Sequence, residues 1–237
     1  MTLLHLSRLP SGEPEIFASV QGEGITVGLP SAFVRLAHCN LRCSWCDTKY
    51  TWEWSSYDPR QEIVKLSPAA AADLALALDV VNVVVSGGEP LLQQRPLADL
   101  LVRLKAAERR IEIETNGTIA PDPSLASLVD QWNVSPKLAS SGNAAHRRER
   151  MGPLAWFSAA SNAQFKFVAG SADDLPEVGL LAARYGVDPS RIVITPEATD
   201  PETLRQRSLD LAPACIAKGY RLGTRLHVVL WGSARGR

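Results

Sequence analysis

Excess charge of either sign is absent from this 237-residue sequence, in which 25 Lys and Arg residues balance 25 Asp and Glu residues. Without a bulk field to attract polyanions, nucleic acid and anionic membrane surfaces are disfavoured as partners. No apolar run is long enough to span a bilayer, which argues against a membrane protein. The N-terminal stretch MTLLHLSRLPSGEPEIF lacks a basic segment followed by a sustained apolar core, so no secretory signal is predicted.

Cysteine is also scarce, with four residues in the whole chain and three of them between positions 39 and 46. In the absence of a secretory signal we expect a cytoplasmic protein, because thiols in that compartment serve metals or catalysis more often than disulfides. A cytoplasmic metalloprotein or redox protein is therefore the starting expectation.

Short apolar, β-branched runs alternate with helical patterns along the chain. The run 80–86 predicts a strand buried on both faces, because no polar alternation interrupts it. Further strands are predicted at residues 31–37, 111–115, 131–135, 163–169, 191–195 and 225–231. Strand followed by helix, repeated about six times, favours a parallel α/β sheet or barrel in a single domain.

Helices are predicted between these strands, at residues 66–79, 95–109, 171–186 and 200–220. Ser67 stands where an N-cap belongs, and Pro68 stands at the first helical position. Gly186 and Gly219 are typical of helices that end in a left-handed residue.

The carboxyl ends of parallel strands gather at one rim, and the expected junctions there read CNLRCSWCDT, SGGEP, ETNGT, SPK and TPEA. All five are rich in small or polar residues, which predicts a functional site at this rim. Elsewhere, the polar and basic stretch 139–152 predicts a solvated loop, and Cys215 is expected to be a buried small residue in a helix.

The spacing Cys39-x3-Cys43-x2-Cys46 places three thiols on a loop directly after a strand. Three thiolates can hold three corners of a four-iron cluster and leave one iron open. A structural zinc site would need a distant fourth ligand, because the adjacent His38 is expected to point away from the same centre. A disulfide with a leftover thiol is the third alternative and the weakest in a reducing compartment.

This cysteine spacing, with Trp45 before the last cysteine, resembles the cluster loop of radical S-adenosylmethionine enzymes. In that family the open iron binds the amino and carboxylate groups of the cofactor, and the fold is a partial, open β/α barrel of the TIM type. The motif SGGEP resembles the family's second motif, in which Gly87 and Gly88 would let the backbone approach the cofactor's ammonium group and Glu89 would help to hold its charge. Taken alone, GGEP would be a turn in which Pro90 begins a helix.

Further stretches narrow the resemblance to the 7-carboxy-7-deazaguanine synthases, radical enzymes of 7-deazapurine and queuosine biosynthesis. The specific matches are QGEG, CxxxCxWCDT, SGGEP, ETNGT and SPK, and the similarity extends from Phe17 to His227. The resemblance implies one radical S-adenosylmethionine domain over residues 1–237, with a substrate-binding segment at 13–36 and a cluster loop at 38–50.

The resemblance also implies roles for individual residues. The cluster ligands would be Cys39, Cys43 and Cys46, and Thr48 would bind Mg²⁺. The positions that would bind S-adenosylmethionine are Trp45, Cys46, Asp47, Gly87, Gly88, Glu89, Ser135, Pro136, Lys137, Thr195, Pro196, Glu197 and Ala198. The substrate would contact Val20, Gln21, Gly22, Glu23, Arg35, Ser86 and a terminal carboxylate, here that of Arg237, with His227 as a further candidate. Without the resemblance, Glu23 and Arg35 would be read as members of ion pairs, and Thr48 as a hydroxyl that caps backbone.

The implied reaction converts 6-carboxy-5,6,7,8-tetrahydropterin to 7-carboxy-7-deazaguanine, with ring contraction and loss of ammonia. A one-electron donor of the flavodoxin or ferredoxin type would reduce a [4Fe–4S] cluster, and S-adenosylmethionine would then yield a 5′-deoxyadenosyl radical that takes a hydrogen from C6 of the pterin. Members of the family are usually homodimers.

Two alternatives stay open. One is a related activase that installs a glycyl radical on a partner protein, against which QGEG and CDT argue. The other is a non-catalytic iron–sulfur electron carrier or zinc module, which would not need polar motifs at successive strand ends.

Overall fold

Ten strands form one mixed sheet in residues 2–237, the part of the chain that this computed structural model describes. The strands that run parallel to their neighbours are β3 (Pro30–Leu36), β5 (Asn82–Gly87), β6 (Arg110–Thr115), β7 (Gln131–Val134), β8 (Ala163–Ala169), β9 (Ile192–Pro196) and β10 (Arg221–Leu222). Antiparallel pairs add β1 (Leu4–Ser7), β2 (Ile16–Val20) and β4 (Ile63–Leu66). The six expected strands between residues 31 and 195 are confirmed to within two residues at each end, whereas β1, β2 and β4 were not predicted.

Helices follow most of the parallel strands. They are α1 (Pro59–Glu62), α2 (Pro68–Leu76), α3 (Gln94–Ala106), α4 (Pro123–Ala126), α5 (Ala145–Arg148), α6 (Met151–Ala159), α7 (Leu175–Tyr185), α8 (Pro201–Lys218) and α9 (Leu226–Trp231). The Ser67 hydroxyl caps α2 by accepting a hydrogen bond from the amide of Ala70 at 3.1 Å. Gly186 and Gly219 end α7 and α8 with φ of 66° and 68°. The predicted start and stop signals are therefore confirmed.

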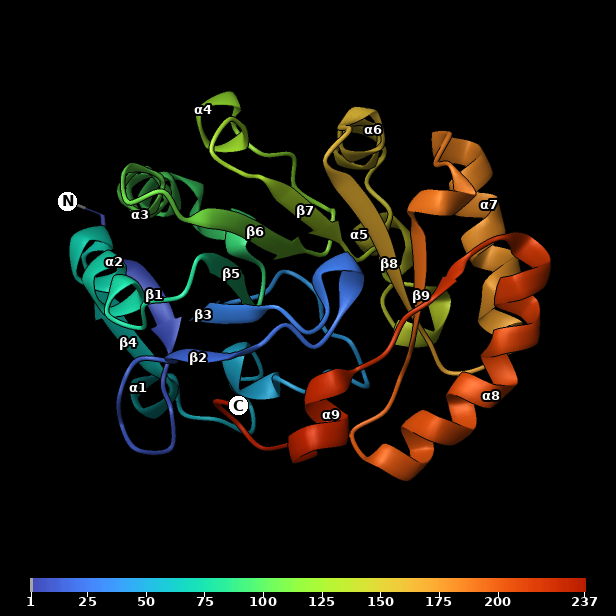
Figure 1. Ribbon diagram of the computed structural model, residues 1–237, viewed down its shortest axis with the longest axis horizontal. Coiled ribbons are helices and arrows are strands. Elements are labelled where there is room, and N and C mark those ends of the chain that lie inside the picture. Colours follow the sequence, from blue (N-terminus) through green and yellow to red (C-terminus); the bar gives the residue numbers. More distant parts are fainter. Residues whose placement is uncertain (1) are drawn as a thin grey trace.

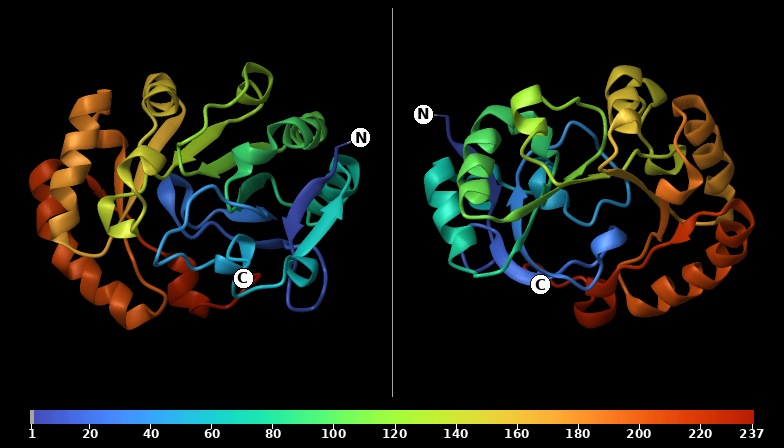
Figure 2. Two further views of the ribbon diagram at one scale, coloured as in Figure 1. Left: turned by 180° about the vertical axis from the view of Figure 1, so that it is seen from behind. Right: turned by 45° about the horizontal axis from the view of Figure 1, so that its top comes forward.

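The sheet is an open arch whose helices lie on the convex side. Its strand order is β10-β9-β8-β7-β6-β5-β3-β1-β4, with β2 also paired to β3, so that the two ends do not meet. Figures 1 and 2 show α2, α3, α6, α7 and α8 outside this arch, while α9 and the C-terminal tail lie across its open side. The expected open β/α barrel is confirmed. Within residues 2–237, no helix is both long and apolar enough to cross a membrane.

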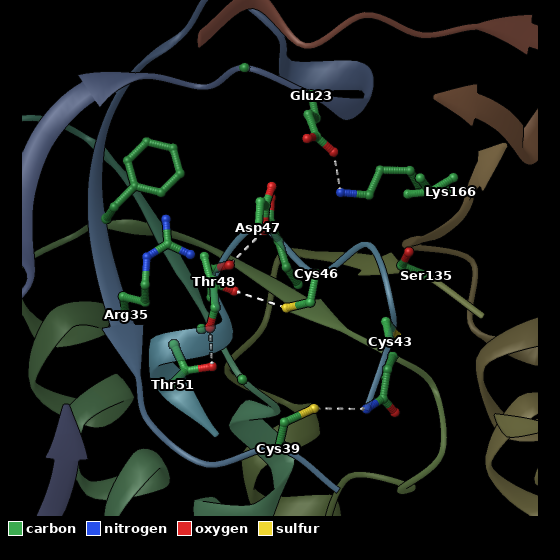
Figure 3. Close-up of a pocket in the computed structure, with 18 of the residues that line it drawn as sticks. Glu23, Arg35, Cys39, Cys43, Cys46, Asp47, Thr48, Thr51, Ser135 and Lys166 are labelled. Carbon is green, nitrogen blue, oxygen red and sulfur yellow. Dashed lines mark hydrogen bonds and ion pairs between the residues drawn. The ribbon is translucent and has the colours of Figure 1, made fainter. Parts of the chain in front are cut away.

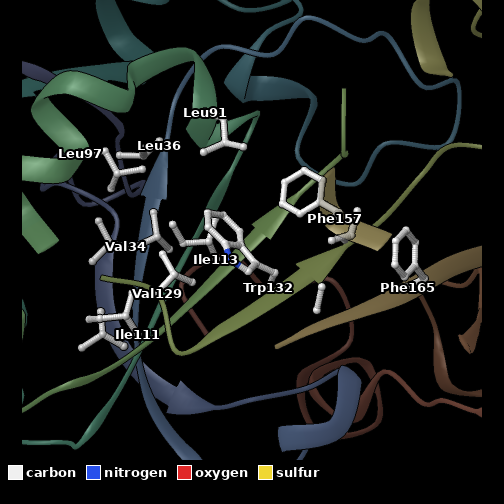
Figure 4. Packing of buried hydrophobic residues seen from close by; sticks show 14 of the residues in the cluster. Val34, Leu36, Leu91, Leu97, Ile111, Ile113, Val129, Trp132, Phe157 and Phe165 are labelled. Carbon is white, nitrogen blue, oxygen red and sulfur yellow. The ribbon is translucent and has the colours of Figure 1, made fainter. Parts of the chain in front are cut away.

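Side chains alternate between the two faces of each parallel strand, as the strand period of two requires. On β6, Ile111 and Ile113 join the hydrophobic core between sheet and helices. Trp132, which is fully buried in this core, packs edge-on against Phe157 with ring centroids 5.3 Å apart (Figure 4). The alternate residues of the same strands face the interior of the arch.

Around Glu112, the interior of the arch is a layer of buried polar side chains. Glu112 of β6 accepts hydrogen bonds at its Oε2 from the Thr26 hydroxyl at 2.9 Å and from the Asn133 side-chain amide at 3.0 Å. Arg110 pairs with the other carboxylate oxygen. Thr26 ends the 3₁₀ turn η1 (Gly24–Thr26), so this layer anchors the loop that connects β2 and β3.

Two sequence predictions are wrong. The run 225–231 forms helix α9 from Leu226 onward rather than a strand: Val228 packs on Ala198 and Leu204, while Val229 and Leu230 stay exposed. An apolar run this short does not distinguish helix from strand by its period. The stretch 139–152 is not a plain loop either, because it contains α5, the 3₁₀ turn η4 (Ala139–Ser141) and the start of α6. The buried Arg148 holds α5 in place through an ion pair with Glu177 at 2.5 Å.

The polar layer generates a stability prediction. Replacing Thr26 by Val removes a hydrogen bond to a buried carboxylate and should lower the free energy of unfolding by about 2 kcal/mol, measured by urea denaturation. Ser127→Ala, which removes an exposed hydroxyl, should change it by less than about 0.5 kcal/mol. Equal effects of the two substitutions would show that the Thr26–Glu112 contact does not anchor the loop.

Candidate active site

A cavity opens on the concave side of the sheet, at the carboxyl ends of the parallel strands (Figure 3). About 1210 Å³ of empty space lies in the cavity together with the solvent-open region at its mouth. The predicted site residues that line it are Val20, Gln21, Gly22, Glu23, Arg35, Cys39, Cys43, Trp45, Cys46, Asp47, Thr48, Ser86, Gly87, Gly88, Ser135, Lys137, His227 and Arg237. The predicted residues outside its lining are Glu89, Pro136, Thr195, Pro196, Glu197 and Ala198.

Cys39, Cys43 and Cys46 are free thiols around one side of this cavity. Within residues 2–237, no three Cys, His, Asp or Glu side chains converge on a point where one metal ion would be held. Three free thiols that line one cavity suit the corner positions of a four-iron cluster. Burial raises the pKa of Cys39 to about 12 and also raises that of Cys43, so cluster binding must displace their protons.

The glycines of SGGEP let β5 approach the backbone that leads into the cluster loop. Gly87 has φ of 134°, and a Cβ atom on Gly88 would overlap the carbonyl group of His38. The Gly88 amide donates to the Leu36 carbonyl at 2.9 Å, and the Glu89 amide donates to the His38 carbonyl at 2.8 Å. The two sequence motifs are therefore joined through their backbones.

Glu89 is turned into the protein rather than toward the cavity. Its carboxylate accepts hydrogen bonds from the Thr115 hydroxyl at 2.8 Å and from the amides of Leu91 and Asn116 at 3.0 and 2.7 Å. Burial raises its pKa, although these donors oppose the change. In this arrangement Glu89 connects the SGGEP turn to the ETNGT loop and makes no contact with the cavity.

Glu23 is the centre of a buried ion network. Its Oε2 pairs with Lys166 of β8, and its Oε1 accepts a hydrogen bond from Arg225 Nε at 2.9 Å. Burial alone would raise the pKa of Glu23, but the two cations hold it well below its ordinary range. The carboxylate is thus a permanently ionised acceptor at the cavity wall.

Arg225 connects three segments around the cavity. Besides Glu23 of the β2–β3 loop, its guanidinium group pairs with Asp47 of the cluster loop and donates to the Ala198 carbonyl in the TPEA loop. Partial burial would raise the pKa of Asp47, but Arg225 lowers it. The TPEA loop therefore supports the site from behind its wall.

Arg35 reaches the cavity from β3. Its Nε pairs with the buried Glu15 at 2.9 Å, and the Tyr50 hydroxyl donates to the same Glu15 oxygen at 3.0 Å. Burial opposes the charge of Arg35, but Tyr50 and Glu15 raise its pKa, so it stays cationic. Arg235 of the C-terminal tail stacks on Tyr50, 3.4 Å from the ring centre, and thereby brings the tail beside Arg35.

Helix α9 packs directly on the QGEG motif. The Leu226 amide donates to the Gly22 carbonyl at 2.9 Å, and a Cβ atom on Gly22 would overlap the His227 ring. Burial lowers the pKa of His227 and so favours the neutral imidazole, although the nearby Glu23 carboxylate opposes this change. Both His227 and Arg237 line the cavity.

The remaining predicted residues take definite positions. Lys137 donates to the Ser135 hydroxyl at 2.8 Å and lies 5.5 Å from the centre of the Trp45 ring. The Thr48 hydroxyl lies 3.6 Å from the Cys46 sulfur. In Figure 3, Thr48 lies beside Cys46, whereas the pair of Glu23 and Lys166 lies at the end of the cavity away from Cys39.

Sequence reasoning missed several cavity residues. Among them, Glu114 accepts hydrogen bonds from the Ser86 hydroxyl at 2.7 Å and from the Gln21 amide at 3.4 Å. A signal for it was present, since IEIET and QFKF alternate apolar and charged residues with the period of a strand, which places Glu114 and Lys166 on the inner face. Arg225 had no such signal, because the segment that it begins was expected to be a strand.

The open barrel and the three-thiol loop define a radical S-adenosylmethionine enzyme, and residues 34–154 match the Radical SAM superfamily. Over 94% of its length the chain is 42% identical to the 7-carboxy-7-deazaguanine synthase of Pyrobaculum aerophilum, of which the match covers 96%. It is 34% identical to the synthase of Halobacterium salinarum over 93% of this chain and 90% of that one. The crystal structure of QueE from Escherichia coli superposes with a TM-score of 0.67 at 25% identity, covering 94% of this chain and 95% of that chain. The chain belongs to the 7-carboxy-7-deazaguanine synthase family.

The ion network predicts a specific dependence of stability on pH. Glu23→Gln leaves Lys166 and Arg225 buried without their anion and should lower the free energy of unfolding of the cluster-free protein by about 3 kcal/mol at neutral pH. Because the folded-state pKa of Glu23 lies below its ordinary value of 4.5, its stabilising contribution is complete above that value and is lost as the pH falls toward the lower one. The difference between wild type and variant should therefore shrink only in acid, measured by urea unfolding at several pH values.

Glu202→Gln is the matched control, because the Glu202–Arg205 pair is exposed. It should change stability little at any pH. A Glu23→Gln effect that does not change between neutral and acid pH would contradict the assignment of an ionised Glu23.

Proposed function

We propose that this chain is a carbon–nitrogen lyase that converts 6-carboxy-5,6,7,8-tetrahydropterin to 7-carboxy-7-deazaguanine with loss of ammonia, in 7-deazapurine and queuosine biosynthesis. Family membership supports the reaction. The observation that carries it to this chain is that three free thiols share one cavity with a fixed anion, Glu23, and a fixed cation, Arg35.

The charged residues suit a flat heterocycle that carries one carboxylate. The guanidinium group of Arg35 would bind the substrate's carboxylate. The carboxylate of Glu23 would accept hydrogen bonds from ring N–H and amino groups, beside Gln21 and the backbone of Val20 and Gly22. Ser86 would contact the substrate at the floor of the cavity.

Cys39, Cys43 and Cys46 would hold the [4Fe–4S] cluster of a radical S-adenosylmethionine enzyme. When bound, this cluster and S-adenosylmethionine supply the 5′-deoxyadenosyl radical. The cofactor would lie along Trp45, Asp47, Gly87, Gly88, Ser135 and Lys137, all of which line the cavity near the thiols. Glu89, Pro136 and residues 195–198 would act from behind the wall, by fixing the loops that touch the cofactor.

Partners and location complete the proposal. A radical S-adenosylmethionine enzyme needs a one-electron reductant, for which we propose the flavodoxin or ferredoxin type, and we propose a homodimer. A cytoplasmic location would keep Cys39, Cys43 and Cys46 reduced. The activase alternative is less favoured, because the chain belongs to the synthase family over more than nine-tenths of its length.

The reaction is tested by mass analysis of the product. Anaerobically reconstituted protein should convert the carboxylated tetrahydropterin to the deazaguanine acid only when S-adenosylmethionine and a reductant are present. Cys43→Ala should abolish the product, whereas Cys215→Ala, a substitution at a buried thiol of α8 outside the cavity, should retain it. Full activity of Cys43→Ala would refute the radical mechanism.

Magnesium dependence tests Thr48 separately. A hard cation that keeps most of its waters needs few protein ligands, and one hydroxyl beside the substrate's carboxylate would be enough. Thr48→Val should raise the Mg²⁺ concentration for half-maximal activity by about tenfold or more, and Thr48→Ser should restore it. If removal of Mg²⁺ leaves the wild-type rate unchanged, the assignment of Thr48 is wrong.

A further inference from the structure

Two side-chain N–H groups outside the cluster loop's own backbone are aimed at the proposed cluster sulfurs. The Asn143 side-chain amide donates to the Cys43 sulfur at 3.3 Å. The Trp52 indole N–H donates to the Cys46 sulfur at 3.3 Å. Neither donor is needed to ligate iron, so their convergence on the sulfurs calls for another role.

The direction of the Asn143 amide is fixed by its own contacts. Its Oδ1 accepts a hydrogen bond from the Arg42 amide at 2.9 Å, which leaves the NH₂ group facing Cys43. The Asn143 carbonyl in turn accepts a hydrogen bond from Arg148, which is held by its pair with Glu177. Within the segment 139–152, Asn143 thus presents an oriented N–H donor to the Cys43 sulfur.

Trp52 is constrained in a different way. It follows the 3₁₀ turn η2 (Lys49–Thr51), and its backbone amide donates to the Lys49 carbonyl at 3.0 Å. The indole nitrogen can only donate, and within residues 2–237 its partner is the Cys46 sulfur. Trp54, two residues later, instead packs edge-on against His38 with ring centroids 5.8 Å apart.

The hydrogen bonds to the Cys39 sulfur are longer. Cys39 receives the Leu41 backbone amide at 3.5 Å, and the Asn116 side-chain amide lies 4.0 Å away. The side-chain donors therefore concentrate on Cys43 and Cys46, the two ligands of the short C-x2-C half of the motif.

Hydrogen bonds to ligand sulfurs are among the factors that set the potential of an iron–sulfur cluster. Reduction by one electron adds one negative charge, which is spread over the irons and sulfurs. An N–H dipole aimed at a sulfur stabilises the reduced form more than the oxidised form and so raises the reduction potential.

We propose that Asn143 and Trp52 are positioning residues that act through Cys43 and Cys46 to raise the reduction potential of the cluster and so ease entry of the electron. The inference rests on the cluster and not on the pterin chemistry. It assigns a role to a residue of the basic segment, Asn143, and to an aromatic residue of the cavity wall, Trp52.

The test uses the full chain, reconstituted with iron and sulfide and held without substrate. Trp52→Phe keeps an aromatic ring and removes the N–H, and Trp54→Phe is the matched control on the same segment. Asn143→Leu removes the second donor. The midpoint of reduction is measured by titration with low-potential dyes followed by electron paramagnetic resonance, and iron and sulfide contents are measured in parallel.

We expect Trp52→Phe and Asn143→Leu each to shift the midpoint to more negative potential with unchanged iron content, and Trp54→Phe to leave it at the wild-type value. Wild-type potentials in both donor variants would overturn the inference. Loss of the cluster from both, with retention in Trp54→Phe, would also overturn it, because the donors would then hold the cluster rather than set its potential. Failure of the proposed function would be seen differently, as normal potentials without deazaguanine product.

Discussion

The backbone pairing between SGGEP and the entrance to the cluster loop is the contact on which the site depends. Amides of Gly88 and Glu89 donate to the carbonyls of Leu36 and His38, and this approach leaves no room for a side chain on Gly88. The same contact holds His38 at a φ of 73°, with its ring 2.8 Å from His5 and so committed away from the thiols. The loop thus offers three free thiols, and a four-iron cluster bound by them would keep one coordination position open for a cofactor. Glycine is therefore required at position 88 by the close approach of the protein's own backbone, independently of any cofactor.

On the opposite wall of the cavity, the segments are held together by ion pairs of Glu23 rather than by backbone hydrogen bonds. Isolated buried charges are costly, so Glu23 and its two cations are stable only as a set. Because Arg225 belongs to that set and also binds Asp47 and the Ala198 carbonyl, one guanidinium group fixes the β2–β3 loop, the cluster loop and the TPEA loop relative to one another. Residues 195–198 are therefore connected to the cavity wall through Ala198, although none of them lines the cavity.

Much of this could be read from the sequence, for identifiable reasons. The parallel strands from residue 31 to 195 are either continuous apolar runs, as in β5, or alternate with the period of a strand, as in β6 and β8. The caps at Ser67, Gly186 and Gly219 are local signals, so neither the strands nor the caps need tertiary information to be predicted. Most of the motif residues that line the cavity could be named because QGEG, the three-cysteine motif and SGGEP resemble the contiguous motifs of a known family. Arg225 could not be found, because it acts through three segments that only the fold brings together, and α9 could not, because a short apolar run carries no reliable period.

Glu112 and Glu114 could be predicted only in part: their position inside the arch follows from the sequence, but their partners do not. The alternation in IEIET places both carboxylates inside the arch, but it does not say which one meets a ligand. One pleat repeat, about 7 Å along β6, separates them. At the lower position Glu112 is fully buried, with partners in Thr26, Asn133 and Arg110. At the upper position Glu114 is held by Ser86 and Gln21 and faces the cavity. Identical side chains on one face of one strand therefore have different surroundings, because η1 ends at Thr26, which covers Glu112, whereas Glu114 faces the cavity.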